Sequence, residues 1–485
     1  MSLNDAQQIA VDYHSGHCLI VAGPGTGKTH TLIARMIRIA TVLKPHEKIL
    51  AITFTNKSAD EMLNRLKAGS IRLDSVQVGT FHRFCLSLLR QYINDTPLPK
   101  DFKVALPNDI ESLIEDKNTI ERIGFAKSTQ LVLEATPELL AYQKALRANG
   151  FIDFDDILRE ALMLLDTNED ILKEVSAQYP FIFVDEYQDT NPIQHELLRL
   201  LAFNGSTVTA IGDPNQAIYG FRGSDVELFH RFEDDFKGAQ VFYLNENYRS
   251  GLNILNASSQ VIAINSRRGV PQLTAKLYND GKLTVHEATT DRAEAEFIAH
   301  QIEKIVGGLM MRRAQATHHS FGDIAILTRL NAQQQVIAQA LEHLGIPYQI
   351  AKKITPPDNS DDNVLGQREE ELDYTIEKVS LLTLHAAKGL EFPVVFMAGC
   401  EEKILPLDLV NLTSDINEER RLFYVGMTRA KEELFLTYAK RRQLFGQALM
   451  LSASPFLADI QEDLKAYEMA RRKKAVKVDD QLKLF

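Results

Sequence analysis

Short apolar runs recur along this chain, and each precedes a stretch with helical periodicity. The runs are CLIVAG (18–23), KILAITFT (48–55), FIFVDE (181–186), TVTAIGD (207–213), DIAILTR (323–329), VSLLTLH (379–385) and FPVVFMAG (392–399). A strand that is apolar along its whole length is buried on both faces, which is typical of a parallel sheet covered by helices. The runs form two clusters, at 18–213 and 244–438. We therefore predict two α/β domains with a cleft between them.

Length and composition agree with more than one folded unit. The chain has 485 residues and a mass of 54.7 kDa, whereas one ordinary core takes roughly 100 to 200 residues. Its 54 Lys and Arg stand against 65 Asp and Glu, which gives a net charge of −11. This balance excludes a histone-like polycation. It does not exclude nucleic acid as a ligand, because binding depends on where the cations lie.

Cysteine usage and the distribution of apolar residues indicate the compartment. Cys18, Cys85 and Cys400 are odd in number and far apart, which argues against a disulfide framework, a zinc ribbon and a four-cysteine iron–sulfur site. The chain begins without a basic segment followed by an apolar stretch, and it contains no apolar run of about 18 residues. We therefore expect a cytoplasmic protein that does not enter a membrane.

Two interruptions and a tail divide the predicted domains. Between 85 and 180 the strand signals give way to long amphipathic helical stretches, which predicts a helical insertion in the first domain. Residues 351–378 are acidic and poor in apolar side chains, as expected of an exposed loop. Residues 461–485 include a basic run and are expected to form a tail. The predicted domains are therefore 1–84 with 181–248, and 249–350 with 379–460.

The segment LIVAGPGTGKTHTL places a glycine-rich turn between a buried strand and a helix, which is the context of a phosphate-binding loop. Glycines let backbone N–H groups approach phosphate oxygens, a lysine reaches the β and γ oxygens, and a hydroxyl holds Mg²⁺. Ala22 replaces the first glycine of the strict pattern. The candidate residues of this loop are Gly23, Gly25, Thr26, Gly27, Lys28 and Thr29.

A second apolar strand, FIFVDEY, ends in two adjacent acids. Asp185 is placed to hold hydrated Mg²⁺, and Glu186 to polarise the attacking water. The alternative for this pair is a solvated acidic strand end. Taken together, the glycine-rich loop and the acid pair predict a P-loop NTPase with ATP and Mg²⁺ as its cofactors.

Ten segments in chain order resemble the UvrD/Rep/PcrA-type superfamily 1A DNA helicases. They are LNDAQQIAV (3–11), AGPGTGKT (22–29), ITFTNKSADEM (52–62), VGTFHRF (78–84), VDEYQDTN (184–191), IGDPNQAIYGFRG (211–223), LNENYRS (244–250), DIAILTR (323–329), LLTLHAAKGLEFPVVF (381–396) and EERRLFYVGMTRAKEEL (418–434). The resemblance implies a fold of two RecA-like parallel-sheet P-loop NTPase domains. It also implies that the insertion is the family's first accessory domain.

The resemblance also assigns nucleotide contacts. It implies that Gln7 reads the adenine edge, that Tyr248 stacks on the base, and that Glu391 contacts the sugar. Gln216 resembles the γ-phosphate sensor. Arg249 and Arg429 resemble two arginine fingers, which stabilise charge on the transferred phosphoryl group when the cleft closes. Interdomain salt bridges are the alternative for these arginines.

DNA contacts follow from the same resemblance. Strand-end loops would track a single strand across both domains, and exposed rings would stack between bases. The candidates are Phe54, Thr55, Asn56, Thr80, Phe81, His82, Tyr219, Phe221, Arg222, His385 and Lys388. Core packing is the alternative for Phe54 and Phe81. Phe221 stands where the family commonly has Trp, and this chain contains no Trp.

The chain departs from the family in two places. Only 351–378 occupies the position of the second accessory (2B) domain, so that domain is expected to be missing. The last five residues resemble the bacterial sliding-clamp-binding peptide, with Gln481, Leu482, Leu484 and Phe485 as the binding side chains. The alternative for these residues is a chain end that packs on its own domain.

The resemblance implies an ATP-dependent DNA helicase that moves 3′ to 5′ on single-stranded DNA and acts at single-strand/duplex junctions. It suggests roles in repair, replication or recombination. One alternative is a DNA-stimulated translocase that displaces proteins or needs a partner to unwind. A third reading is a tethered recognition module in which ATP hydrolysis drives a conformational switch.

Overall fold

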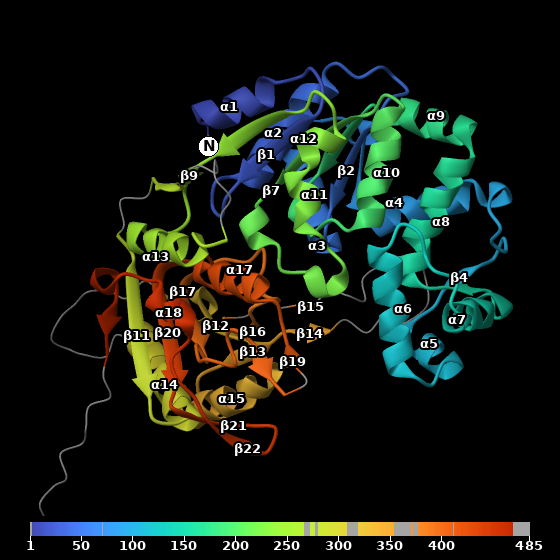
Figure 1. Ribbon diagram of the computed structural model, residues 1–485. Coiled ribbons are helices and arrows are strands. Elements are labelled where there is room, and N and C mark those ends of the chain that lie inside the picture. Colours follow the sequence, from blue (N-terminus) through green and yellow to red (C-terminus); the bar gives the residue numbers. More distant parts are fainter. Residues whose placement is uncertain are drawn as a thin grey trace, which may run out of the picture.

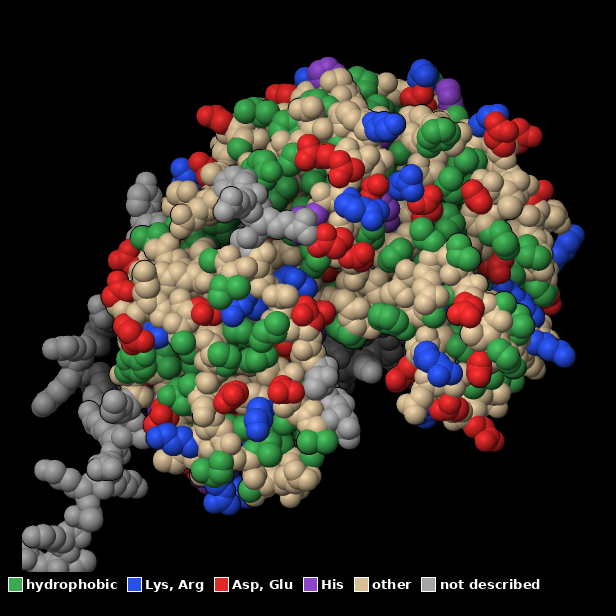
Figure 2. Space-filling view, viewed as in Figure 1, with side chains coloured by type: hydrophobic (Ala, Val, Ile, Leu, Met, Phe, Trp, Pro, Cys, Tyr) green, Lys and Arg blue, Asp and Glu red, His purple; other side chains and the backbone are tan. Residues whose placement is uncertain are grey.

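The computed structural model describes residues 2–69, 71–265, 272–276, 280–307, 319–353, 370–371, 377–410 and 412–468. The first α/β domain lies at the top of Figure 1, the second at the lower left and the helical insertion at the lower right. In the space-filling view a hollow separates the insertion from the second domain (Figure 2). The predicted fold class, two parallel-sheet α/β domains with a helical insertion in the first, is confirmed.

The first domain is built on a six-stranded parallel sheet in the order β3-β2-β6-β7-β1-β8. Its strands are β1 (Cys18–Ala22), β2 (Ile49–Thr53), β3 (Val76–Thr80), β6 (Phe181–Val184), β7 (Thr207–Gly212) and β8 (Gln240–Leu244). The helices of this domain are α1 (Asp5–Asp12), α2 (Lys28–Ala40), α3 (Asn56–Ala68), α4 (Phe81–Gln91), α10 (Pro192–Phe203), α11 (Val226–His230) and α12 (Phe232–Asp235). Because all strands run the same way, the loops after β1, β6 and β7 meet at one edge of the sheet.

The helical insertion shares part of its core with the first domain. Its helices are α5 (Pro107–Leu113), α6 (Lys117–Thr129), α7 (Pro137–Ala148), α8 (Phe154–Thr167) and α9 (Glu169–Gln178), with a short parallel pair β4 (Lys103–Val104) and β5 (Phe151–Ile152). Leu158 and Leu164 of α8 belong to the same buried cluster as Leu50 and Ile52 of the first sheet. The insertion is therefore joined to the first domain by packing as well as by the chain.

The second domain contains a seven-stranded parallel sheet in the order β13-β16-β12-β17-β20-β11-β23. Its strands are β11 (Lys282–Ala288), β12 (Ile324–Thr328), β13 (Tyr348–Ile350), β16 (Val379–Thr383), β17 (Phe392–Ala398), β20 (Ala430–Ala439) and β23 (Ala466–Tyr467). The helices are α13 (Leu252–Ile262), α14 (Asp291–Gly307), α15 (Gln334–His343), α17 (Ile416–Met427) and α18 (Pro455–Ala458). Short pairs outside the main sheets are β9 (Glu246–Asn247) with β10 (Thr274–Ala275), β14 (Lys352–Lys353) with β15 (Glu370–Glu371), β18 (Asp408–Leu409) with β19 (Leu412–Thr413), and β21 (Arg441–Leu444) with β22 (Gln447–Met450).

All seven apolar runs contain a strand of the two parallel sheets, as predicted. The strands that the sequence did not reveal include β8, which is an edge strand, and β11, whose sequence mixes polar and apolar residues. The predicted tail at 461–485 is wrong for its first residues, because β23 pairs with β11. A two-residue strand is too short to leave a periodic pattern. The predicted loop at 351–378 contains the antiparallel pair of β14 and β15.

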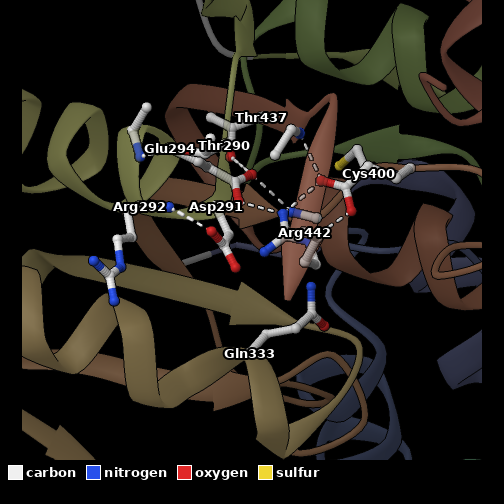
Figure 3. A network of polar contacts seen from close by, with 12 residues as sticks. Thr290, Asp291, Arg292, Glu294, Gln333, Cys400, Thr437 and Arg442 are labelled. Atoms are coloured by element: carbon white, nitrogen blue, oxygen red, sulfur yellow. Dashed lines mark hydrogen bonds and ion pairs between the residues drawn. The ribbon is translucent and has the colours of Figure 1, made fainter. Parts of the chain in front are cut away.

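A buried ion cluster fastens the hairpin of β21 and β22 to the second domain. Arg442 of β21 lies between Glu294 of α14 and Glu401, which follows β17 (Figure 3). Its Nε donates to the Glu401 carboxylate at 2.7 Å, and all three side chains are at most 1% exposed. A buried charge is tolerated only when it is paired in this way. The cluster therefore holds elements that are far apart in the sequence.

Candidate nucleotide and nucleic-acid site

The glycine-rich turn between β1 and α2 forms a cradle of backbone groups. Gly25 and Gly27 have φ angles of 68° and 81°, a left-handed region that glycine adopts without strain. Asn247 Nδ2 donates to the Pro24 carbonyl at 2.6 Å, and Tyr248 N donates to the Gly25 carbonyl at 2.8 Å. Residues 247 and 248, which follow the first sheet in the chain, thus hold the turn in place. The sequence did not indicate this role for Asn247. Free N–H groups at the start of α2 suit an anion.

The catalytic candidates of the first domain lie together after β1 and β6. Lys28 Nζ is 3.5 Å from the Glu186 carboxylate, and Gln188 Nε2 donates to the same carboxylate at 2.6 Å. Glu186 has a φ of 50°, which is unusual for a residue with a side chain and turns the chain sharply at this point. Burial opposes its ionisation, but Lys28 and Lys388 outweigh that effect and lower the pKa of Glu186 to about 2.

The neighbouring acid behaves differently. Burial and the Glu186 carboxylate raise the pKa of Asp185 to about 7, and burial also raises the pKa of Asp213, at the end of β7. The charge of Lys28 opposes this rise at both acids and also acts on Glu186, beside which Lys388 adds a second positive charge. No group of three or more His, Cys, Asp or Glu side chains in the described ranges is arranged to hold a metal. Asp185 could contribute one ligand to a Mg²⁺ ion, which takes few protein ligands and completes its shell with phosphate and water.

Gln216 is joined to the acids through a short relay. Its Nε2 donates to Asp213 Oδ2 at 2.8 Å, and Asp213 N donates to Gln188 Oε1 at 3.0 Å. Gln188 in turn donates to Glu186. The predicted sensor and the predicted base are therefore linked by two residues, Gln188 and Asp213, that lie within matched segments but were not assigned a role.

The predicted adenine contacts are only partly exposed. Gln7 is buried; its Nε2 donates to the Thr26 carbonyl at 3.0 Å, and its Oε1 accepts from Asn4 N at 3.0 Å. Its amide therefore binds the phosphate loop in this structure. The Tyr248 side chain is 43% exposed, and its hydroxyl donates to Glu246 at 2.5 Å. This bond fixes the ring at the surface, where a base could stack on it.

The two predicted arginine fingers make different contacts. Arg249 Nε donates to Glu391 Oε2 at 2.6 Å, so the predicted sugar contact is an ion-pair partner here. Arg429 is 1% exposed and donates to the carbonyls of Val425 and Leu390, each at 3.0 Å. Burial and the nearby Arg249 lower the pKa of Arg429 to about 9. The predicted alternative, an interdomain salt bridge, does not describe these contacts of Arg429.

A row of rings crosses from the first domain to the second. Phe54 stacks on Tyr219 with 4.9 Å between centroids, Tyr219 lies 6.1 Å from Phe221, and Phe221 meets the edge of His385 at 5.3 Å. The Arg222 guanidinium lies 5.4 Å from the Tyr219 and Phe221 centroids. These residues line a groove with a cavity of about 340 Å³. Such a surface suits unpaired bases and is tolerant of their sequence.

The structure distinguishes Phe54 from Phe81, which the sequence could not do. Both line the groove cavity, but Phe81 is 7% exposed and packs in the core of the first domain, whereas Phe54 stacks on Tyr219 in the ring row. Burial, together with Arg329, Arg222 and Lys388, lowers the pKa of His385 to about 3, so its ring is neutral.

The insertion contributes to the groove as well. Phe154, the first residue of α8, lies 3.8 Å from His82 between ring centroids, and both line the cavity with Asp155. The sequence did not single out Phe154. Its position directly after the N-cap Asp153 is the local signal that it stands at a helix start. Only the structure shows that it faces the cavity.

The remaining predicted DNA contacts lie where loops turn into helices. Thr55 and Thr80 cap α3 and α4 by accepting from Ser58 N at 3.1 Å and from Arg83 N at 3.3 Å, and Asn56 is the first residue of α3. Backbone and hydroxyl groups at helix starts suit phosphate oxygens.

Lys388 contacts the segments that follow β6 and β7. It forms a buried ion pair with Asp189 and donates to the Gln216 carbonyl at 2.7 Å, while its ammonium lies 4.8 Å from the Tyr219 centroid. In this structure it therefore joins the two domains. Its predicted DNA contact would require that ion pair to open.

Two family models match the chain over most of its length. The UvrD/REP helicase N-terminal domain matches residues 3–140 and 129–237, and the UvrD-like helicase C-terminal domain matches residues 242–355 and 361–441. The chain belongs to the UvrD/REP helicase family. The two models meet between β7 and β9, close to where the polypeptide leaves the first sheet.

Curated relatives of this UvrD-type chain include ATP-dependent DNA helicases named PcrA. The protein of Staphylococcus aureus strain Mu50 is 27% identical over 641 positions, which cover 95% of this chain and 86% of the relative. That of Staphylococcus epidermidis strain ATCC 12228 is 26% identical and covers 99% of this chain. The alignment of 641 positions exceeds the 485 residues of the chain, so the relative carries sequence that this UvrD-type chain lacks.

The predicted sliding-clamp-binding residues Gln481, Leu482, Leu484 and Phe485 lie outside the described residues. Within the described ranges, no helix is long and apolar enough to cross a lipid bilayer.

Proposed function

We propose that this chain is an ATP-dependent DNA helicase that moves 3′ to 5′ along single-stranded DNA and opens duplex at single-strand/duplex junctions. The observation that carries the proposal is a direct connection between the two sites. Lys388 binds Asp189 and the Gln216 carbonyl beside the catalytic acids, and it also lies over Tyr219 in the ring row. The polarity rests on the family resemblance.

Each residue of the cleft has a role in this proposal. The backbone of the glycine-rich turn and Lys28 bind the phosphates of ATP, and Glu186, which stays ionised, orients and deprotonates the attacking water. Gln216 senses the γ-phosphate through the relay to Glu186. Arg249 and Arg429 stabilise the charge that develops on the transferred phosphoryl group.

Arg429 must change partners for this to happen. It now donates to carbonyl oxygens of its own domain, and closure of the cleft would exchange those weak acceptors for phosphoryl oxygens. Thr29 and Asp185 would hold Mg²⁺, which neutralises phosphate charge when bound. Tyr248 would stack on adenine, and Gln7 would release Thr26 to reach the base edge.

In this proposal the groove binds the single strand of DNA. Bases would stack against Phe54, Tyr219, Phe221 and His385, while phosphates would lie along the helix starts at Thr55 and Thr80. Opening and closing of the cleft would then alternate the hold of the two domains on the strand and produce directed stepping.

Strand displacement on matched 3′-tailed and 5′-tailed duplexes tests this proposal. With ATP and Mg²⁺, the 3′-tailed duplex should be opened and the 5′-tailed duplex should not. Lys28→Ala should open neither, because the phosphates lose their ammonium partner. Equal opening of both tailed duplexes would contradict the polarity, and activity of Lys28→Ala would contradict the site.

A second candidate function is a DNA-stimulated translocase that displaces proteins or needs a partner to unwind. It is favoured by the sequence that the relatives have and this chain lacks, and only 351–378 stands in the place of a second accessory domain. ATPase activity that single-stranded DNA stimulates, together with displacement of a bound protein but no duplex opening, would support this candidate. Duplex opening by the chain alone would exclude it.

The C-terminal residues Gln481, Leu482, Leu484 and Phe485 extend the proposal to a partner, the bacterial sliding clamp. Leucine and phenylalanine side chains of such a peptide fill apolar pockets, and its glutamine hydrogen-bonds to the partner. A pull-down with the clamp should lose the chain when 481–485 is deleted. Unchanged capture of the truncated chain would remove this partner.

A further inference from the structure

Helix α17 of the second domain holds the backbone that precedes the exposed rings of the groove. Arg421 Nε donates to the Ala217 carbonyl at 2.6 Å, and Glu418 Oε1 accepts from Gly220 N at 3.1 Å. The Arg421 and Glu418 side chains lie one turn apart on the same face of the helix. Two side chains of one domain thus bind two backbone groups of the other.

The bound segment connects the two sites of the first domain. It begins at Gln216, which bonds to Asp213, and continues to Tyr219 and Phe221 of the ring row. Ala217 is buried, so a shift of its backbone would also move Arg421, which binds its carbonyl. A Cβ atom at Gly220 would lie 2.5 Å from Glu418 Oε2, so the helix side chain approaches the backbone closely.

The other end of α17 leads to Arg429, the proposed arginine finger. The helix has 12 residues, a length of about 18 Å at 1.5 Å per residue, and Arg429 follows its last residue by two positions. A packed helix moves as a rigid element. Movement of Arg429 toward phosphate would therefore displace Arg421 and Glu418 together with it.

We propose that Arg421 and Glu418 are positioning residues that transmit cleft closure to the DNA-stacking loop at 219–222. The proposal rests on the proposed function of the cleft and the groove. Both side chains act through the backbone of residues 217 and 220 and do not touch the nucleotide or DNA themselves. Their loss would leave each site intact, and also the Lys388 contact, and would remove the link that runs through α17.

The electrostatics of the contact agree with a held, partly buried pair. Burial raises the pKa of Glu418, and the Arg421 guanidinium opposes that rise. Burial also lowers the pKa of Arg421, and Glu418 opposes that change. Each charge therefore stabilises the other in a site that water reaches poorly.

The same helix offers a matched control. Arg420 is adjacent to Arg421 but donates to the Val261 carbonyl at 2.9 Å and pairs with Asp459, both in its own domain. Arg420→Met and Arg421→Met remove the same group from one helix. Only the second removes a contact with the first domain.

The test measures the dissociation constant of a fluorescent oligo(dT) strand, with and without a non-hydrolysable ATP analogue. In the wild type the analogue should change DNA affinity by about 5- to 150-fold, the usual range of coupling between two sites. Arg421→Met should reduce this change to about twofold or less, while ATPase activity without DNA stays within about twofold of wild type. Arg420→Met should keep the full change.

Gly220→Ala attacks the contact from the other side and guards against misfolding of Arg421→Met. The added methyl group would push Glu418 away, and the response of DNA affinity to the analogue should fall as it does in Arg421→Met. If the ATP analogue changes the DNA affinity of Arg421→Met and Gly220→Ala as much as that of the wild type, the inference is wrong although the proposed function stands. If the wild type itself shows no response, the proposed function fails, and this inference with it.

Discussion

The nucleotide cleft and the DNA groove lie against each other but are built from different groups. In the cleft, charged side chains bind one another at short range, as Lys28 and Glu186 do. In the groove, rings such as Phe54 and Tyr219 lie in a row, and polar contacts come mostly from helix starts. A charge works only at one position, whereas a ring surface tolerates shifts and substitutions. Changes in the cleft should therefore stop turnover and spare DNA binding, and changes in the groove should do the reverse.

The largest effect is expected from Arg429→Ala. Removal of an arginine finger lowers turnover by about 10³- to 10⁵-fold in phosphoryl transfer. Steady-state ATPase assays with saturating DNA measure this loss. Arg429 is buried, so thermal unfolding must show that the variant is folded. A folded variant with more than a tenth of wild-type turnover would remove Arg429 from the cleft machinery.

Glu186→Gln is expected to have the next largest effect. The amide cannot take a proton from water, and loss of a general base lowers turnover by about 10²- to 10⁴-fold. Binding of a fluorescent ATP analogue and of oligo(dT) should stay close to wild type, because Gln keeps the shape of Glu. Weakened DNA binding in this variant would show that cleft and groove cannot be separated in this way.

Phe221→Ala should reverse the pattern. Loss of one stacking ring costs about 1 to 3 kcal/mol per base, so the concentration of DNA needed for half-maximal ATPase stimulation should rise by about 5- to 150-fold. Turnover at saturating DNA should hold. Phe203→Ala is the matched control, because Phe203 is 91% exposed and does not line the groove. Equal effects in the two variants would contradict the ring row.

The smallest effect concerns the free energy of unfolding at low pH, through a histidine of the groove. The pKa of His385 is about 3 in the folded chain, below the value of about 6.5 expected when unfolded. The unfolded state therefore binds a proton first, and stability falls as the pH drops from 6.5 toward 3. His385→Gln should remove about 1 to 2 kcal/mol of this fall at pH 5. Parallel pH profiles in urea unfolding would show that His385 does not titrate in this way.

The strands and the phosphate loop could be read from the sequence because their signals are local. The buried runs at 49–53 and 392–398 are apolar along nearly their whole length, and Gly27 directly precedes the helix that it starts. Strands β8, β11 and β23 gave no such signal, because edge strands and mixed strands are defined by their neighbours. Phe54 and Phe81 could not be told apart in the sequence, and only the tertiary structure shows that Phe81 packs in the core while Phe54 stacks on Tyr219, although both line the groove.

The sequence by itself determined two parallel α/β domains, the insertion and the residue types that bind phosphate, since these depend on local periodicity and on short motifs. Tertiary structure alone decided the partners. It placed Lys388 on Asp189, turned Arg429 toward Leu390, and laid Arg421 on Ala217. The physical reason is that an ion pair or a hydrogen bond forms only between groups brought within about 3 to 4 Å. No pattern along the chain sets that distance between residues that lie 39 to 204 positions apart.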